Sequence, residues 1–243
     1  PALANSHSHA LTLPELLEKF FLLRKHLKQA TVITYRNCIN ELDAFLKHPA
    51  ITQITASDIT RYQEHLANAQ KKNSTRTIDN KISIIRALFN FAKKQGYTKQ
   101  DNPAANRALL TKKQRLAGGY AIFERDEIAA FFSSSFFKEQ QKKDPDYANA
   151  VLLGLFTGCR IGEITNLQTS QFKITQSGIR YITIRDSKTS AGIREVPLHP
   201  FAYKLVSDFI ENKNGKIFKY VEKDGKGTGN AVGKKFARNL IDA

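Results

Sequence analysis

The chain has 243 residues, 41% of them hydrophobic, which is enough to form a core in one or two globular domains. Its formal net charge of +16, from 38 Lys and Arg against 22 Asp and Glu, favours polyanionic partners, with nucleic acid first among them. No apolar stretch approaches the roughly 20 residues of a membrane span, no signal peptide pattern begins the chain, and its two cysteines lack zinc or disulfide-scaffold spacing, so we expect a reduced, cytoplasmic protein without a membrane partner.

Positive charge is distributed along the whole chain. Residues 1–107 hold 16 Lys and Arg against 8 Asp and Glu, and residues 108–243 hold 22 against 14, so each part carries an excess of 8. This distribution argues against a neutral enzyme with a basic tail. Charge alone leaves open whether the partner is DNA, RNA or an acidic membrane, or whether the basic surface only solvates the protein.

Residues 1–105 are predicted to form an all-helical domain. Apolar residues recur there at three- and four-residue spacings in four segments, which is typical of helices that bury one face. Polar breaks separate the segments, and the Thr-x-x-acid pattern of Thr55 and Asp58 is a helix-start signal. The helices are expected to begin near Thr12, Thr31, Thr55 and Thr75, with the last ending near Gly96.

Residues 106–121 are predicted to be a basic interdomain linker. The segment contains four basic residues and a Gly pair, without a sustained hydrophobic period. A linker that crosses DNA has this composition. Lys112, Lys113 and Arg115 are therefore candidate DNA contacts.

Residues 122–243 show a mixed pattern. Helical spacing occurs in FERDEIAAFFSS, PDYANAVLLGLFTG, IGEITNL, HPFAYKLVSDFIEN and the final GNAVGKKFARNLIDA. GIRYITIRD and GIREVPL flank the turn SKTSAG and predict a β-hairpin, whereas KIFKYV fits either a short edge strand or a buried turn. The expected fold class is mainly α with a small β-hairpin or sheet: a helical N-terminal domain followed by an α+β domain.

Several common catalytic patterns are missing from the sequence. There is no GxGxxG after a strand, no Walker phosphate loop, no HExxH and no GxSxG. The six histidines lack metal-ligand spacing. We therefore expect neither a nucleotide cofactor nor a metal.

Arg160, within LFTGCRIGEITNL, is a candidate phosphate-binding residue. It follows an apolar helix and a Gly break, and Glu163 lies one helical turn later. A guanidinium held by a carboxylate suits bidentate contact with a phosphate and can stabilise charge that grows during phosphoryl transfer. The structural alternative is an ordinary Arg at a helix start, paired with Glu163.

Lys188, in RDSKTSAGIREVPL, lies at the tip of the predicted hairpin. A lysine on such a turn can follow a DNA groove and reach a leaving oxygen, although a structural lysine there would only solvate the turn. Arg160 and Lys188 in this order, with a hairpin between helices, form a more specific pattern than either residue alone.

With these features the chain resembles the tyrosine recombinase, or phage integrase, family over nearly its whole length. The N-terminal helices, including ITQITASDITRYQEHL and STRTIDNKISIIRALFNFAKKQGYTKQDNPA, look like the family's core-binding domain. LLGLFTGCRIGEITNLQ looks like the first catalytic-arginine motif, and SKTSAGIREVPLHP like the hairpin that bears the catalytic lysine.

The resemblance implies a protein that clamps duplex DNA between two domains and joins a tyrosine to a 3′-phosphate during strand exchange. Carried onto this sequence, Arg160 would bind the scissile phosphate, Glu163 would support the active-site fold and Lys188 would protonate the departing 5′-oxygen. The family assembles on DNA as dimers to tetramers and needs no metal or nucleotide. Accessory DNA-bending proteins are further candidate partners.

The sequence departs from the family at its C-terminal end. The His-x-x-Arg and nucleophilic Tyr patterns do not occur before Ala243, and Tyr181, Tyr203 and Tyr220 are interpreted as structural. We therefore expect residues 122–243 to be an incomplete catalytic domain that binds DNA without cleaving it. The alternatives are a DNA-binding regulator or accessory factor derived from the recombinase fold, and an unrelated helical RNA-binding protein.

Overall fold

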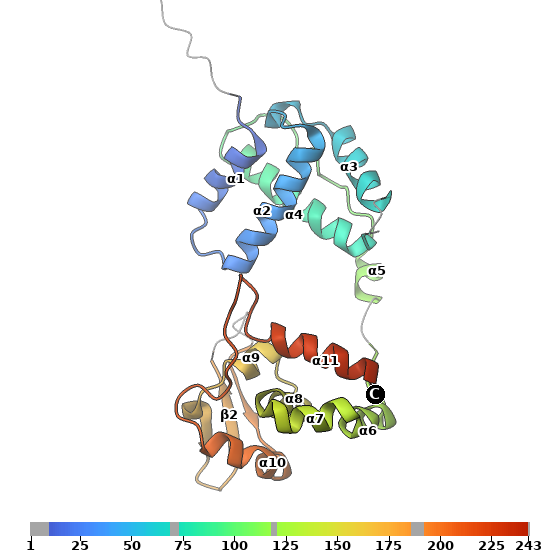
Figure 1. Ribbon diagram of the computed structural model, residues 1–243. Coiled ribbons are helices and arrows are strands. Elements are labelled where there is room, and N and C mark those ends of the chain that lie inside the picture. Colours follow the sequence, from blue (N-terminus) through green and yellow to red (C-terminus); the bar gives the residue numbers. More distant parts are fainter. Residues whose placement is uncertain (1–9, 69–72, 118–120, 186–191, 243) are drawn as a thin grey trace, which may run out of the picture. The chain divides into compact units, whose positions relative to one another are not determined.

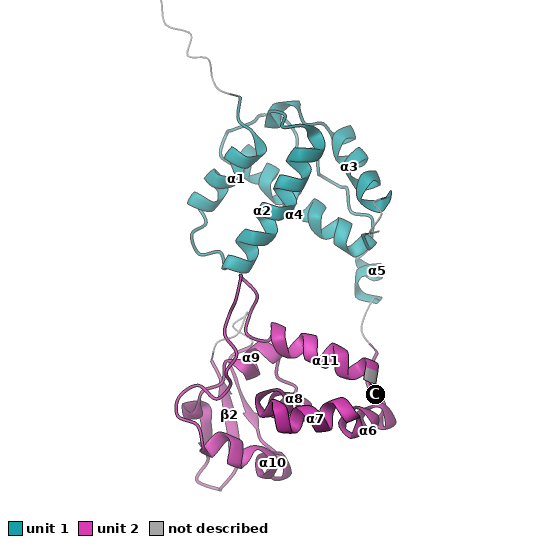
Figure 2. Ribbon diagram, in the orientation of Figure 1, with its two compact units in different colours: residues 1–120 teal, residues 121–243 magenta. Residues whose placement is uncertain are grey.

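The computed structural model describes residues 10–68, 73–117, 121–185 and 192–242. The chain divides into two compact units, residues 1–120 and 121–243 (Figures 1 and 2). The division falls at the end of the segment predicted to be a linker.

Unit 1 is a helical domain built around one long helix. Its described elements are α1 (Leu13–Leu22), α2 (Gln29–Leu46), the 3-10 turn η1 (Ile51–Gln53), α3 (Ala56–Asn68), α4 (Thr75–Lys94) and α5 (Lys112–Ala117). Helix α4 contacts α1, α2 and α3. Its buried face includes Ile78, Ile82, Ile85 and Phe89, which follow the helical period. The predicted four-helix arrangement is confirmed.

Side-chain hydrogen bonds mark the starts of α3 and α4. The backbone N–H of Thr55 donates to Asp58 Oδ2 at 2.8 Å, as the sequence pattern predicts, and the N–H of Thr77 donates to Ser74 Oγ at 3.2 Å. Gly96, with φ of +76°, follows the end of α4. The second helix begins at Gln29, two residues before the predicted start.

Part of the predicted linker is regular structure. Residues 112–117 form helix α5 within unit 1, and this short helix has no buried residue. A helix that buries no apolar face leaves no hydrophobic period in the sequence, which is why the pattern did not reveal it.

Unit 2 combines helices with a small antiparallel sheet. Its described elements are α6 (Arg125–Ser133), α7 (Ser135–Lys143), α8 (Pro145–Thr157), α9 (Ile161–Thr165), η2 (Thr169–Gln171), β1 (Phe172–Ile174), β2 (Arg180–Ile184), β3 (Arg194–Pro197), α10 (Pro200–Glu211) and α11 (Asn230–Asp242). The strand order is β1-β2-β3, and Ile182 pairs with Phe172 on one side and Val196 on the other. Helix α8 contacts α7, α9, α10 and α11 and is the centre of this unit.

The sequence predicted most of unit 2 correctly. The hairpin strands β2 and β3 and the helices α6, α8, α9, α10 and α11 are all present. Helix α7 was not predicted because its sequence, SFFKEQQKK, is mostly polar, and β1 is too short to show alternation. KIFKYV forms neither a full strand nor a turn. Lys216 makes an isolated antiparallel β-bridge with Gln168, the Ile217 N–H donates to the Leu167 carbonyl at 3.0 Å, and Ile217 and Phe218 are buried.

A close backbone approach joins the start of α11 to α9. The hydroxyl oxygens of Thr165 and Thr228 share a buried hydrogen bond of 2.7 Å. A Cβ atom on Gly229 would lie 2.7 Å from Ile161 Cγ2 and 3.2 Å from the Gly162 nitrogen. Only glycine fits this contact without displacing α9.

We therefore expect Gly229→Ala to destabilise the protein by about 1–3 kcal/mol, because the added methyl overpacks the contact with α9. Gly233→Ala is the matched control, since a Cβ there meets nothing within 4 Å, and helix propensity predicts a gain of about 0.5–1 kcal/mol. Urea unfolding measures both. Equal stability of Gly229→Ala and the wild type would show that the two elements are not in tight contact.

Candidate phosphate-binding site in unit 2

The site begins where α8 ends. Gly158 adopts the left-handed conformation, with φ of +62°, and its N–H donates to the Gly154 carbonyl at 3.0 Å. This turn stops α8 and lets Arg160 precede α9 with an extended backbone. The Gly break identified in the sequence is therefore what places Arg160 at the start of a new helix.

Glu163 holds Arg160 at two points. The backbone N–H of Arg160 donates to Glu163 Oε2 at 3.0 Å, and its Nη1 donates to Glu163 Oε1 at 2.9 Å. The Glu163 side chain is 6% exposed, whereas the Arg160 side chain is 64% exposed. A buried carboxylate thus anchors a guanidinium that is largely accessible to solvent.

Arg194 of β3 binds the same carboxylate and was not identified from the sequence. Its Nη2 lies 3.0 Å from Glu163 Oε2, its Nη1 donates to the Gly192 carbonyl at 2.9 Å, and it also contacts the Cys159 sulfur at 3.5 Å. Strand alternation was the available signal, because Arg194 lies on the face of β3 that also carries the half-buried Val196. An arginine in such a position needs a carboxylate partner.

The electrostatics of Glu163 follow from these contacts. Burial by itself raises the pKa of this carboxyl, but hydrogen bonds from Arg194 and from the backbone and guanidinium of Arg160 outweigh burial and lower the pKa to about 2. The hydrogen bond to Glu163 correspondingly raises the pKa of Arg194. Two guanidinium groups share one carboxylate, and the largely exposed Arg160 guanidinium is suited to contact with an anion such as a phosphate.

The structure brings together only part of the predicted site. Arg160 and Glu163 are in contact, and Lys188 lies outside the described residues. Arg194 connects the base of the Lys188 hairpin to Glu163. Lys112 and Lys113 are exposed on α5 in unit 1, and Arg115 of the same helix is paired with Asp79.

The tyrosines interpreted as structural lie in different environments. The Tyr203 hydroxyl donates to Glu211 Oε1 at 2.6 Å. The Tyr220 side chain is buried, and burial raises the pKa of its hydroxyl. Tyr181 pairs with Lys173 and Pro197 within the sheet.

An apolar cavity of about 370 Å³ lies among α6, α8, α9 and α11. Its lining includes Phe131, Val151, Ile164 and Phe236. These side chains offer no donor to an anion, so the cavity does not suit a phosphate.

Within the described ranges, no group of three or more His, Cys, Asp or Glu side chains is arranged to hold a metal ion. Among the same residues, none of the helices has the length and apolar character needed to cross a membrane.

The pKa of Glu163 predicts a pH-dependent contribution to stability. A lowered folded-state pKa stabilises the protein fully above the ordinary value of 4.5, and this contribution is lost as the pH falls from there towards about 2. We expect Glu163→Gln to have a lower urea midpoint than wild type at pH 7 and the difference to shrink between pH 4.5 and the lowest pH at which both proteins fold. A difference independent of pH would contradict the proposed ion pairs.

Comparison with known proteins identifies the helical domain and the fold. Residues 14–108 match the phage integrase SAM-like domain. The chain is 27% identical over 179 residues to the integrase of Escherichia phage 186, a match that covers 70% of this chain and 48% of the phage protein. The chain therefore spans about half the length of this relative.

Solved structures share the fold at lower sequence identity. A lambda integrase dimer bound to a COC′ core site has a TM-score of 0.69 and 20% identity, covering 96% of this chain and 81% of the other. The Tn1549 transposon integrase in complex with circular intermediate DNA has a TM-score of 0.63 and 18% identity, covering 94% and 77%. The helical domain match, the phage relative and the shared fold together support the resemblance to the tyrosine recombinase, or phage integrase, family.

Proposed function

We propose that the protein acts as a site-specific recombinase on duplex DNA and that Arg160 binds the phosphate at which strands are cut and rejoined. The observation that carries this proposal is the exposed Arg160 guanidinium, anchored by the buried Glu163 at the start of α9. A fixed guanidinium can stabilise the charge that develops on a phosphoryl group without a free-energy cost of reorganisation during the reaction.

The proposed chemistry exchanges one phosphodiester for another. A tyrosine hydroxyl gives up its proton as its oxygen forms a bond to phosphorus, the bond from phosphorus to the 5′-oxygen breaks, and the departing oxygen takes up a proton. The product is a 3′-phosphotyrosyl link that keeps the energy of the broken bond, so rejoining is the same step in reverse. Arg160 would stabilise both transition states, Lys188 would donate the proton, and neither Tyr203 nor Tyr220 is assigned as the nucleophile.

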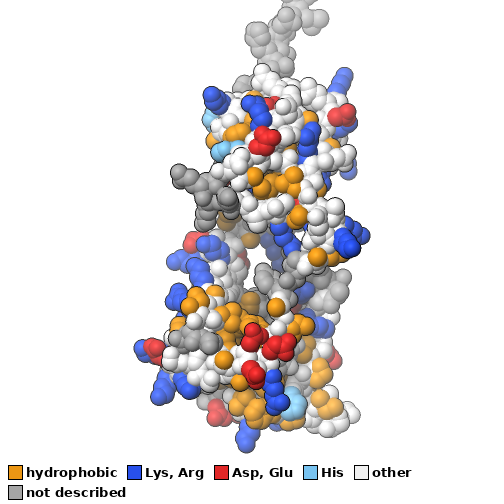
Figure 3. Space-filling model, turned by 90° about the vertical axis from the view of Figure 1, so that its right-hand side faces the viewer, with side chains coloured by type: hydrophobic (Ala, Val, Ile, Leu, Met, Phe, Trp, Pro, Cys, Tyr) orange, Lys and Arg blue, Asp and Glu red, His pale blue; other side chains and the backbone are white. Residues whose placement is uncertain are grey.

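The proposed partners are duplex DNA and further copies of the chain. One related structure is a lambda integrase tetramer bound to a Holliday junction, with a TM-score of 0.70 and 19% identity, covering 98% of this chain and 71% of that one. We propose that this protein likewise assembles on DNA as a dimer or tetramer. Figure 3 shows Lys and Arg side chains scattered over both units on the face drawn, which fits contact with DNA phosphates by each unit.

The second candidate is a DNA-binding regulator that keeps the fold without the chemistry. The sharing of Glu163 between Arg160 and Arg194 favours the recombinase. A guanidinium held in one position suits stabilisation of charge at a single phosphate, whereas diffuse basic charge suffices for non-specific binding.

Duplex binding is tested first with fluorescence anisotropy. We expect the 243-residue chain to bind duplex DNA in preference to duplex RNA of equal length, and the logarithm of affinity to fall linearly with that of salt concentration. Arg160→Ala should lower this slope by about one, the loss of one phosphate contact. Lys204→Ala, which removes an exposed charge from α10, should leave the slope unchanged. Equal competition by RNA would contradict the proposal.

Cleavage is tested on the natural gene product incubated with genomic DNA. We expect a covalent protein–DNA adduct that resists denaturing electrophoresis and disappears in Arg160→Ala, because transition-state stabilisation is lost. DNA binding should persist in the variant, since one phosphate contact among many is removed. An adduct that survives in Arg160→Ala would contradict the role of Arg160, and binding without any adduct would favour the regulator.

A further inference from the structure

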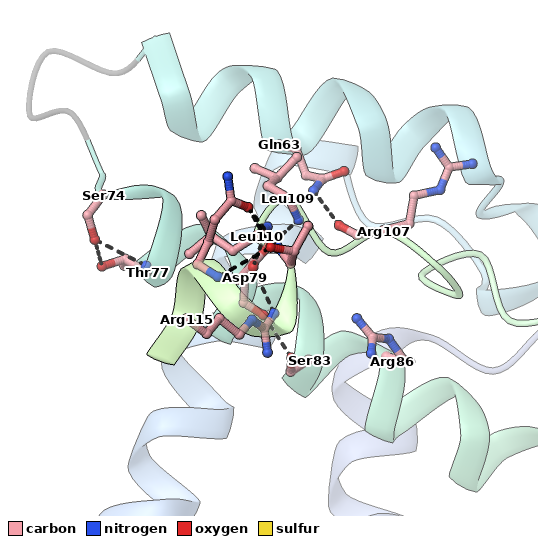
Figure 4. A network of polar contacts seen from close by, with 12 residues as sticks. Gln63, Ser74, Thr77, Asp79, Ser83, Arg86, Arg107, Leu109, Leu110 and Arg115 are labelled. Atoms are coloured by element: carbon pink, nitrogen blue, oxygen red, sulfur yellow. Dashed lines mark hydrogen bonds and ion pairs between the residues drawn. The ribbon is translucent and has the colours of Figure 1, made fainter. Parts of the chain in front are cut away.

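Asp79, on α4 of unit 1, is a buried carboxylate that binds the segment leading into α5 (Figure 4). Its side chain is 1% exposed. The N–H of Leu109 donates to Oδ1 at 2.7 Å, the N–H of Leu110 donates to Oδ2 at 3.1 Å, and Arg115 Nη2 donates to Oδ2 at 2.7 Å. One side chain therefore binds both the backbone before α5 and a side chain within it.

The same segment is attached to α3 a few residues earlier. Gln63 Nε2 donates to the Arg107 carbonyl at 2.9 Å, and Arg107 Nη1 donates to Thr60 Oγ1 at 2.6 Å. Contacts at Arg107, Leu109 and Leu110 thus attach this stretch to both α3 and α4. We call residues 107–117, with these contacts, the docked segment.

The docked segment is held by polar contacts rather than by burial of apolar surface. Helix α5 has no buried residue, and Leu109 and Leu116 are 50% and 76% exposed. Since hydrophobic burial contributes little here, the charge-assisted hydrogen bonds to Asp79 carry the attachment. Lys112 and Lys113 are exposed on α5, while Arg115 is engaged with Asp79.

We propose that Asp79 is a positioning residue for DNA binding. It holds the docked segment so that Lys112 and Lys113 contact the phosphate backbone, while Arg115 contributes through its ion pair with Asp79. The proposal rests on the proposed DNA-binding function. A fixed basic helix binds DNA with a smaller loss of side-chain and backbone entropy than a free one.

The test compares Asp79→Asn with Asp101→Asn in the whole 243-residue chain. Each substitution adds one unit of positive charge, so charge alone predicts tighter DNA binding for both. Asp101 is fully exposed and pairs with Lys93, and both residues lie outside the docked segment. We expect Asp101→Asn to bind a duplex at least as tightly as the wild type and Asp79→Asn to bind it more weakly, with a salt slope lower by up to about two phosphate contacts.

Hydrogen exchange in the absence of DNA measures the stability of the contacts between Asp79 and the docked segment. In Asp79→Asn the Leu109 and Leu110 amides should exchange about tenfold to a hundredfold faster, as expected for the loss of hydrogen bonds to a charged group. Faster exchange with unchanged or tighter DNA binding would overturn the positioning role. If the wild type fails to bind DNA, the proposed function is wrong, and the exchange rates still report on the attachment of the docked segment to Asp79.

Arg115→Gln provides a second variant at a partly exposed position. We expect it to weaken DNA binding in the wild type but not in Lys112→Ala/Lys113→Ala, because Arg115 acts through these lysines. An equal, additive loss in both backgrounds would show that Arg115 acts on DNA binding independently of these lysines and would overturn the proposal. This comparison decides the matter even if Asp79→Asn does not fold.

Discussion

The sharing of one buried carboxylate, Glu163, by two arginines is the interaction on which the candidate site depends. Its partners come from different elements, Arg160 at the start of α9 and Arg194 on β3. Burying the charged Glu163 carboxylate without partners would cost free energy. The two arginines offset this cost together, and the buried carboxylate in turn holds both of them in place. The arrangement fixes the exposed Arg160 guanidinium relative to β3.

Buried acids organise this basic chain at other places as well. Asp79 binds two backbone amides and Arg115, and Asp144 binds Lys219 and Lys235. In both cases burial opposes ionisation of the carboxyl, but hydrogen bonds outweigh it and lower the pKa: those from backbone N–H groups and Arg115 at Asp79, and those from two lysines at Asp144. The positive charges of a chain with a net charge of +16 repel one another. These carboxylates reduce the repulsion locally, because each holds basic side chains in fixed positions. Exposed cations such as Lys112 and Lys113 are available for a polyanion.

The sequence allowed much of the fold to be predicted because most elements bury a periodic apolar face. The Thr55 and Asp58 cap and the Gly158 break were also predictable, because helix starts and helix ends each favour characteristic residues. Helices α5 and α7 were not predictable in this way, since polar residues dominate both. Short elements of this kind are held by tertiary contacts, which hydrophobic periodicity does not record.

The candidate site was predictable only in its local part. Arg160 and Glu163 are three residues apart, so their pairing follows from helix geometry. Arg194 is 31 residues from Glu163, and Asp79 is 36 residues from Arg115, so nothing in the local pattern joins them. The tertiary fold sets both contacts.

A double-mutant cycle on Arg160 and Glu163 tests the central claim most directly, with duplex affinity measured over a range of salt concentrations. If Glu163 acts by holding Arg160 against a phosphate, Glu163→Gln alone lowers the salt slope, and adding Arg160→Ala lowers it no further. Glu163→Gln also removes a negative charge, so simple electrostatics predicts the opposite sign, tighter binding. Tighter binding by Glu163→Gln, or additive losses in the double variant, would contradict the account.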